Sequence, residues 1–158
     1  MAVLDKRHKN NILIELHNQH IESGYITDAE RYIEKYNLNP TKEKMLRWLF
    51  DIFFENLYSE KIHKCIGILK LFREYEVEYS NCFPFLQGMA VACLVSENFE
   101  LIDEGLNVFD CWEDDRSVNI LEKFSLNDIW YDNCRKKIIV DLKSRIDKRK
   151  NYYVRYRP

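Results

Sequence analysis

The sequence predicts an all-α protein, arranged as a short α-solenoid of about eight antiparallel helices or, as an alternative, as an irregular helical bundle. The chain holds only 4 glycines and 3 prolines among 158 residues, whereas a fold of many short strands needs frequent turn residues. Apolar residues recur at the spacing of helices with one buried face. Helix pairs at 41–57 with 60–76 and 83–95 with 98–112 recur at the length of a helical-hairpin repeat, which favours the solenoid.

Local signals delimit the first three helices. The first covers residues 7–22, and Gly24 is expected to follow its end because glycine readily adopts the left-handed conformation found there. Thr27, with Glu30 three residues later, predicts a capping box at the start of the second helix. An Asn-Leu-Asn-Pro segment ends that helix. A third helix begins at Thr41 and is apolar on most sides, so we expect it to be buried.

The next two helices are predicted from a serine and a proline. Ser59 is expected to start the fourth helix, and residues 77–82 form a polar connection after it. Pro84 suits the first turn of a fifth helix, since its missing N–H has no partner there in any case. Gly88 lies inside that helix, where glycine costs about 1 kcal/mol relative to alanine. It therefore predicts a close crossing of two helices.

The sixth and seventh helices are predicted around an acidic turn. Ser96 or Asn98 caps the sixth, and Asp114 and Asp115 begin the seventh, where carboxylates satisfy free N–H groups. The buried stripe of the sixth helix consists of Leu101, Ile102, Leu106, Phe109 and Trp112. The acids of this helix should therefore face solvent rather than an apolar cleft.

The last helix is expected to begin at Ser125, with Asp128 completing a second capping box. Its buried stripe is predicted to be Trp130, Cys134, Ile138, Leu142 and Ile146. Residues 1–150 are thus expected to form a single helical domain. Residues 151–158 lack helical periodicity and are expected to form an extended basic and aromatic tail.

Several classes of protein are disfavoured by the sequence. No apolar run approaches the roughly 20 residues that span a bilayer, and the first residues do not resemble a secretory signal. The 5 cysteines are scattered without a C-x-x-C, which indicates reduced thiols and a cytoplasmic location. His17 and His20 supply two ligands where zinc needs three or four. With no nucleophile elbow or phosphate-binding loop, we expect neither an enzyme nor a bound cofactor or metal.

Charge is distributed unevenly along the chain. The run from Glu97 to Asp115 holds acids and no Lys or Arg, which predicts either an acidic partner-binding face or ordinary solvated helix ends. The residues of the predicted acidic face are Glu100, Asp103, Glu104, Asp110, Glu113, Asp114 and Asp115. The run after Cys134 is basic and offers an alternative face for nucleic acid: Lys136, Lys143, Lys150, Arg155 and Arg157. With a net charge of -2, nucleic acid is the less favoured partner.

Residues 98–146 carry a resemblance to a known class of proteins. A helix there ends in an aromatic and acidic turn, a short helix follows, and a last helix starts with Trp and contains I-x-D-L. The matching residues are Phe109, Trp112, Glu113, Asp114, Leu121, Trp130, Ile139, Asp141 and Leu142. This pattern resembles the C-terminal part of small HEAT-like helical proteins found as bacterial immunity proteins.

The resemblance implies a non-enzymatic protein that binds and neutralises a cognate bacterial toxin. A nuclease toxin is basic because it binds phosphate, so an acidic face on its inhibitor would steer association. The alternative is a helical nucleic-acid-binding or regulatory protein that uses the basic face. The sequence leaves the oligomeric state open.

Overall fold

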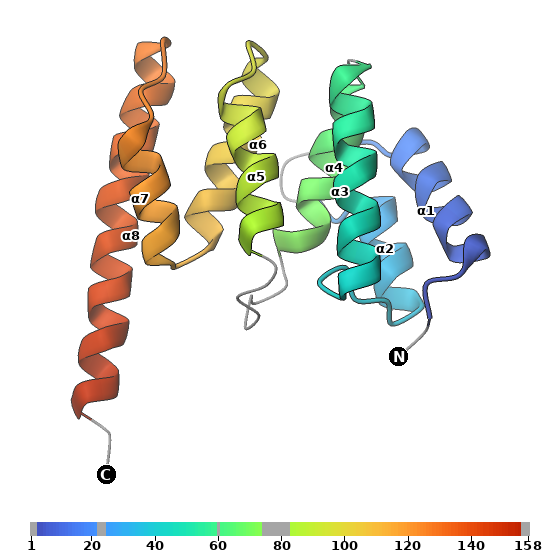
Figure 1. Ribbon diagram of the computed structural model, residues 1–158, viewed down its shortest axis with the longest axis horizontal. Helices are drawn as coiled ribbons and strands as arrows, with labels where there is room; N and C mark the ends of the chain where they lie inside the picture. Colours follow the sequence, from blue (N-terminus) through green and yellow to red (C-terminus); the bar gives the residue numbers. More distant parts are fainter. Residues whose placement is uncertain (1–2, 22–24, 60, 74–82, 156–158) are drawn as a thin grey trace. The chain divides into compact units, whose positions relative to one another are not determined.

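The computed structural model describes residues 3–21, 25–59, 61–73 and 83–155, and over these residues it is all-helical, with eight α-helices and no strand (Figure 1). The helices are α1 (Lys6–Asn18), α2 (Asp28–Lys35), α3 (Glu43–Tyr58), α4 (Ile62–Arg73), α5 (Phe83–Leu94), α6 (Phe99–Cys111), α7 (Asp115–Lys123) and α8 (Ile129–Arg155). The predicted all-α class is confirmed. None of the described helices is both long and apolar enough to cross a membrane.

Three predicted helix starts are confirmed by hydrogen bonds. The Thr27 N–H donates to Glu30 Oε2 at 2.6 Å and the Glu30 N–H donates to Thr27 Oγ1 at 3.2 Å, so the capping box of α2 is complete. Asn98 accepts from the Leu101 N–H and caps α6. Asp114 accepts from the Arg116 N–H and caps α7. In each case a side-chain oxygen satisfies an N–H that has no partner within its own helix.

Two serines end helices rather than begin them. The Ser59 hydroxyl donates to the carbonyl of Glu55, and α4 begins only at Ile62, so the expected start at Ser59 is wrong. The Ser96 hydroxyl likewise donates to the carbonyl of Cys93. The last carbonyls of a helix lack intrahelical donors, and a hydroxyl can donate as well as accept. The predicted Gly24 end signal and the connection at 77–82 lie outside the described residues.

The prediction for α8 is wrong at both ends. Asp128 accepts from the N–H groups of Trp130 and Tyr131 at 2.9 and 3.1 Å, so it caps the helix in place of Ser125. Trp130 is 62% exposed instead of buried, although Leu142 and Ile146 are in the core as expected. The helix also continues to Arg155, so residues 151–155 are not extended. Residues 156–158 are not described.

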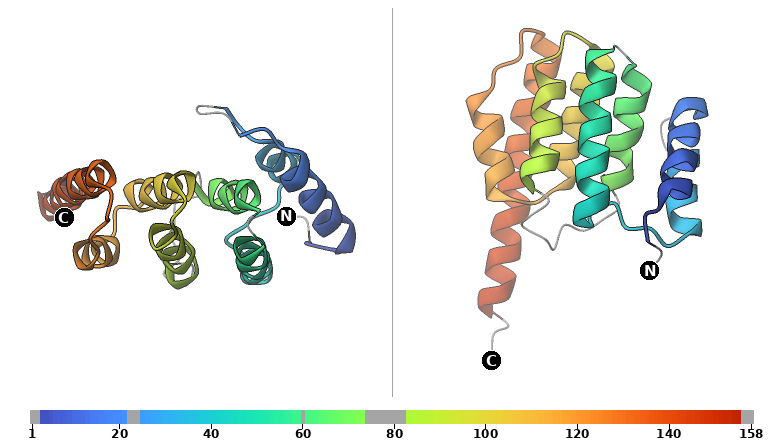
Figure 2. Two further views of the ribbon diagram at one scale, coloured as in Figure 1. Left: turned by 90° about the horizontal axis from the view of Figure 1, so that it is seen from above. Right: turned by 45° about the vertical axis from the view of Figure 1, so that its right-hand side comes forward.

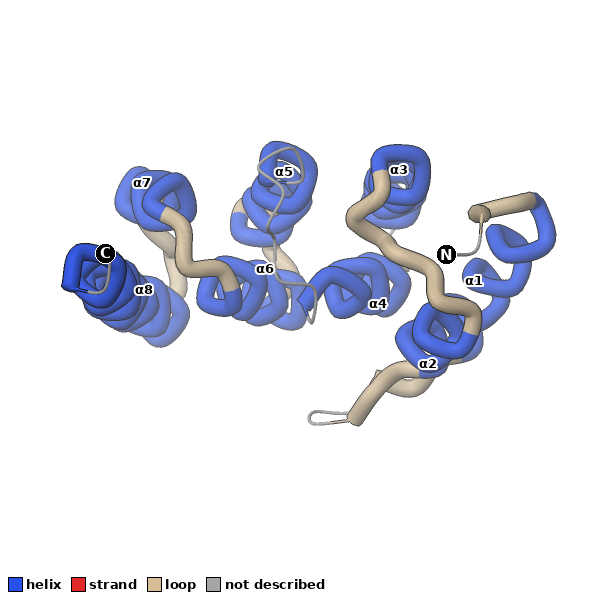
Figure 3. Tube along the Cα trace, turned by 90° about the horizontal axis from the view of Figure 1, so that it is seen from below, coloured by secondary structure: helices blue, strands red, loops and turns tan. Residues whose placement is uncertain are grey.

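The described chain divides into two compact units, Met1–Met89 and Ala90–Pro158, with the boundary inside α5. In the first unit α4 contacts α1, α2 and α3, as Figure 3 shows from below. A Cβ at Gly67 of α4 would lie 1.8 Å from Gln19 Nε2, so this glycine permits a close approach. Among the described residues a Cβ at Gly88 would meet the Phe50 ring alone, at 3.8 Å, so the close crossing predicted there is wrong.

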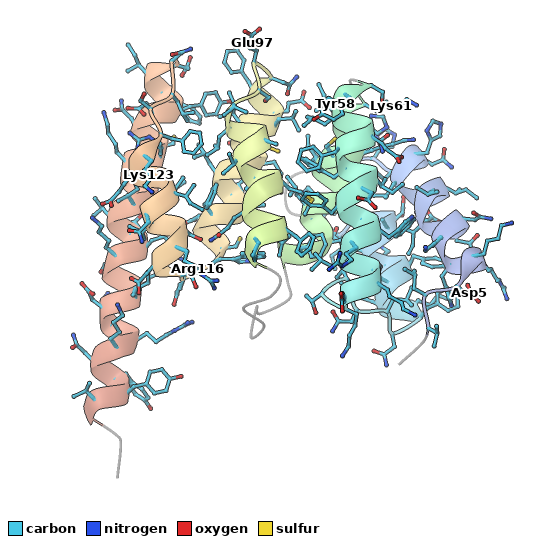
Figure 4. The ribbon with its side chains drawn as sticks, in the orientation of Figure 1. Asp5, Tyr58, Lys61, Glu97, Arg116 and Lys123 are labelled. Atoms are coloured by element: carbon cyan, nitrogen blue, oxygen red, sulfur yellow. The ribbon has the colours of Figure 1, made fainter. Side chains whose placement is uncertain are left out.

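In the second unit α8 contacts both α6 and α7 (Figures 2 and 3). The core of this unit includes Leu106, Phe109, Leu121, Leu142 and Ile146. Figure 1 shows α7 lying along α8, which continues beyond it. The helix α6 runs from one end of the unit to the other, α7 returns, and α8 runs in the direction of α6 (Figure 1). The starts of α6 and α8 therefore lie at one end of the unit, and the α6–α7 turn lies at the other. Glu97 and Arg116 mark these two ends in Figure 4.

Candidate partner-binding site

The acids of the predicted acidic face lie in three different environments: some are buried or cap a helix, some form ion pairs with α8, and some are exposed and unpaired within the described residues. Glu104 is buried, with 5% of its surface exposed. Asp114 caps α7 and forms an ion pair with Arg116 at 3.0 Å. Although burial raises the pKa of the Asp114 carboxyl, the hydrogen bonds from Arg116 lower it overall, so this acid is ionised in its structural role. Neither Glu104 nor Asp114 therefore presents a simple solvated carboxylate.

The acids around the α6–α7 turn are paired with bases of α8. We call this cluster the ion-pair network; it consists of Asp110, Glu113 and Asp115 with Arg145, Arg149 and Lys150. Arg149 lies 3.1 Å from Glu113, and Lys150 lies 3.0 Å from Asp115. Arg145 is bound by Asp110 and lies 3.9 Å from Glu113. The acidic and basic runs, which are distant in sequence, thus neutralise each other within one unit.

The bases of the predicted basic face are also paired with carboxylates of the chain. Lys136 pairs with Asp132 at 2.9 Å, Lys143 pairs with Glu122, and Lys150 belongs to the ion-pair network. The side chain of Arg155 and the whole of Arg157 lie outside the described residues. A nucleic-acid phosphate at this face would have to displace carboxylates that already neutralise three of its five predicted bases.

Glu100 and Asp103 are the two predicted acids that remain exposed at the start of α6. Within the described ranges neither forms an ion pair. Asp103 lies close enough to Tyr131 of α8 for its charge to act on that ring. Asp103 therefore adjoins the beginning of α8, at the end of the unit opposite the ion-pair network.

An exposed group of aromatic rings lies at this end. We call it the aromatic patch and define it as Phe99, Asp103, Asp128, Trp130 and Tyr131. The rings of Phe99 and Tyr131 stack with centroids 5.5 Å apart and an interplanar angle of 18°. The rings of Trp130 and Tyr131 meet edge to face at 4.7 Å. Phe99 is 57% exposed and Trp130 62%, so two large apolar side chains face solvent side by side with a tyrosine.

Two carboxylates, those of Asp103 and Asp128, act on the aromatic patch. Burial, followed by the charges of Asp103 and Asp128, raises the pKa of the Tyr131 hydroxyl. The nearby bases Arg135 and Lys136 are both bound to Asp132. A ring cluster with surplus carboxylates favours contact with a positively charged group.

Sequence reasoning placed Trp130 in the core and so missed this patch. A usable signal was the run of Ile129, Trp130 and Tyr131, because three successive residues turn through about 200° of a helix and cannot all face one core. Ile129 is in fact 79% exposed. The predicted stripe was extended one turn too far toward the N-terminus.

The described residues contain no cluster of three or more His, Cys, Asp and Glu side chains placed to hold a metal ion. Cys65 is fully buried, and burial raises the pKa of its thiol to about 12. This cysteine is therefore protonated at neutral pH and packs as an apolar residue.

Comparison of the chain with protein-family models, with curated proteins and with solved structures gives no match. The aromatic patch is thus identified from its geometry and charge alone.

Proposed function

We propose that the chain is a non-enzymatic protein-binding module that docks a partner on the aromatic patch. The observation that carries this proposal is the exposure of Phe99 and Trp130 beside Tyr131. Trp and Tyr are the residues that most often dominate the binding energy of protein interfaces, because they bury a large rigid surface at small entropic cost. Surplus negative charge at the same place gives a basic partner faster and more selective association.

Within this proposal the chain acts as an immunity protein, and its partner is a cognate bacterial toxin, with a basic nuclease as the best-matched class. The support is the resemblance of residues 98–146 to immunity proteins, together with a patch that favours a positively charged surface. The helices would stack as a HEAT-like solenoid. Antiparallel pairs joined by short connections, such as α3 with α4, are the units from which such a stack is built (Figure 4).

The proposal is tested by co-expression with neighbouring genes. Open reading frames adjacent to the gene for this chain are expressed singly in a bacterial host, and growth is measured with and without the chain. We expect one of them to arrest growth, and the chain to restore it. Absence of any toxic neighbour, or of any rescue, would contradict the immunity function.

A matched pair of variants tests the place of binding. Trp130→Ala removes an exposed ring of the aromatic patch, whereas Tyr58→Ala removes a ring that is 82% exposed in the other unit. We expect Trp130→Ala to weaken the complex by about 2 kcal/mol or more, roughly 30-fold in Kd, and to impair rescue. Tyr58→Ala should leave both unchanged. Equal effects of the two substitutions would show that the patch is not the docking site.

A further inference from the structure

The aromatic patch combines exposed ring surface with acids that no described base neutralises. Trp130 is 62% exposed, so much of its ring stays open to solvent beside Tyr131, which is half-buried and stacked on Phe99. Asp103 and Asp128 both act on Tyr131 and are themselves exposed. Aromatic faces attract cations through their quadrupole, and carboxylates attract them through their charge. The two features therefore select the same kind of ligand.

We propose that the aromatic patch binds an arginine side chain of the partner protein, with its guanidinium plane against the exposed ring of Trp130 and its charge balanced by Asp103 and Asp128. This inference rests on the proposed function and goes beyond it by naming the partner's contact residue. A guanidinium is planar, weakly hydrated and always charged, so it can stack on a ring while donating hydrogen bonds to carboxylates. The compact, strongly hydrated ammonium of lysine cannot do both as well.

No base within the described second unit already fills this role. Arg135 and Lys136, the nearest bases on α8, are held by Asp132 at 2.8 and 2.9 Å. The arginines Arg145 and Arg149 belong to the ion-pair network at the other end of the unit. The patch thus keeps its negative charge available for a group from outside.

The ligand chemistry can be tested without the natural partner. The probes are a short peptide in which arginine and glycine alternate, its lysine counterpart, and a counterpart with citrulline, the neutral isostere of arginine. Titration at low salt is followed by NMR through the indole N–H of Trp130. We expect binding to weaken in the order arginine, lysine, citrulline, with the Trp130 signal shifting most. Equal binding of the arginine and citrulline peptides, or shifts confined to other residues, would overturn the proposal.

Two double variants separate a specific site from a general effect of net charge. Asp103→Asn with Asp128→Asn neutralises the patch, and asparagine retains the cap of α8. Asp141→Asn with Asp147→Asn removes the same charge from exposed positions elsewhere on α8. We expect the first pair to weaken binding of the arginine peptide by about fivefold and the second by less than about twofold. Equal weakening by both pairs would contradict an arginine site.

The two proposals can fail separately. If the arginine peptide does not bind at the patch while Trp130→Ala still abolishes growth rescue, the arginine inference is wrong and the protein-binding function stands. If growth rescue is independent of Trp130 while the arginine peptide binds there, the proposed docking site is wrong and the patch still recognises arginine.

Discussion

At the scale of single residues, Asp132 organises the connection between α7 and α8. Its Oδ1 atom accepts hydrogen bonds from the Leu126 N–H at 3.0 Å and from Arg135 Nε at 2.8 Å, and Lys136 lies 2.9 Å from Oδ2. Arg135 is buried and also donates to the carbonyl of Leu121 at 2.7 Å. The hydrogen bonds from Arg135 and Lys136, with that from Leu126, hold the pKa of Asp132 well below its usual range.

Replacing Asp132 by asparagine should destabilise the protein by about 1 to 3 kcal/mol at neutral pH, because the buried Arg135 loses its anionic partner. The folded-state pKa of Asp132 lies below the value of about 4 in an unfolded chain. The carboxylate therefore contributes stability above about pH 4 and loses it as the pH falls further. Urea unfolding of the unaltered protein and of Asp132→Asn is measured at neutral and acidic pH. The difference between their free energies of unfolding should decrease below about pH 4.

Asp141→Asn provides the control for this measurement, because Asp141 is exposed and forms no ion pair within the described ranges. Its unfolding free energy should follow that of the unaltered protein at every pH. A stability difference for Asp132→Asn that stays constant on acidification would contradict the assigned role of the carboxylate.

At the scale of helices, two glycines in similar positions have opposite roles. A Cβ at Gly105 of α6 would lie 2.9 Å from the Cβ of Cys93 and 3.0 Å from the carbonyl oxygen of Ala90, so α5 and α6 approach closely there. A Cβ at Gly88 of α5 would lie 3.8 Å from the Phe50 ring, an ordinary contact, and would meet nothing closer in the part of the chain that the structure describes. Glycine is thus required at the first position and only tolerated at the second.

Alanine substitutions at the two glycines should therefore have opposite signs. Gly105→Ala is expected to destabilise the protein by about 1 to 3 kcal/mol, because backbone atoms must move to admit the methyl group. Gly88→Ala is expected to stabilise it by about 0.5 to 1 kcal/mol, since alanine has the higher helix propensity and restricts the unfolded chain. Thermal unfolding followed by circular dichroism measures both. A stable Gly105→Ala variant would contradict the close approach of α5 and α6.

Helix starts were predictable from sequence where the signal is local. Thr27 with Glu30, Asn98 and Asp114 each satisfy N–H groups within three residues, so local spacing indicates them, although it left Ser96 as an alternative to Asn98. Ser59 was misread because a serine hydroxyl can serve either end of a helix. Gly88 and Gly105 could not be told apart, since the neighbouring helix decides which glycine is crowded.

At the scale of the whole molecule, the main consequence of folding is the cancellation of two opposite charge runs. In the sequence an acidic run precedes a basic run, but the order of residues does not reveal that the two runs form ion pairs in the folded protein. Arg145 contacts Asp110 across 35 residues of sequence, and such a pairing depends on how α6, α7 and α8 pack. The candidate site differs from the predicted one for the same reason. The acids of the ion-pair network are bound to bases of α8, whereas Asp103 and Asp128 of the aromatic patch remain available to a partner.

This cancellation predicts weak binding to nucleic acid despite the basic last helix. We expect the Kd for single-stranded DNA to remain above about 100 µM at physiological salt, the weak end of non-specific binding. Asp110→Asn, Glu113→Gln and Asp115→Asn combined should release Arg145, Arg149 and Lys150, tighten binding, and steepen its salt dependence by roughly one unit per base freed. Fluorescence anisotropy at several salt concentrations measures this. Submicromolar binding by the unaltered protein would instead support the nucleic-acid alternative.

The contacts of α7 also determine the order in which the second unit can assemble during synthesis. A helix of 9 residues is too short to be stable alone in water, and α7 depends on α8 for the hydrogen bond from Arg135 to Leu121 and for the ion pairs of Glu122 and Asp115. The partner of Asp115 is Lys150, which lies 35 residues further along the chain. Although α7 leaves the ribosome first, its stabilising contacts can form only after nearly all of α8 has been synthesised.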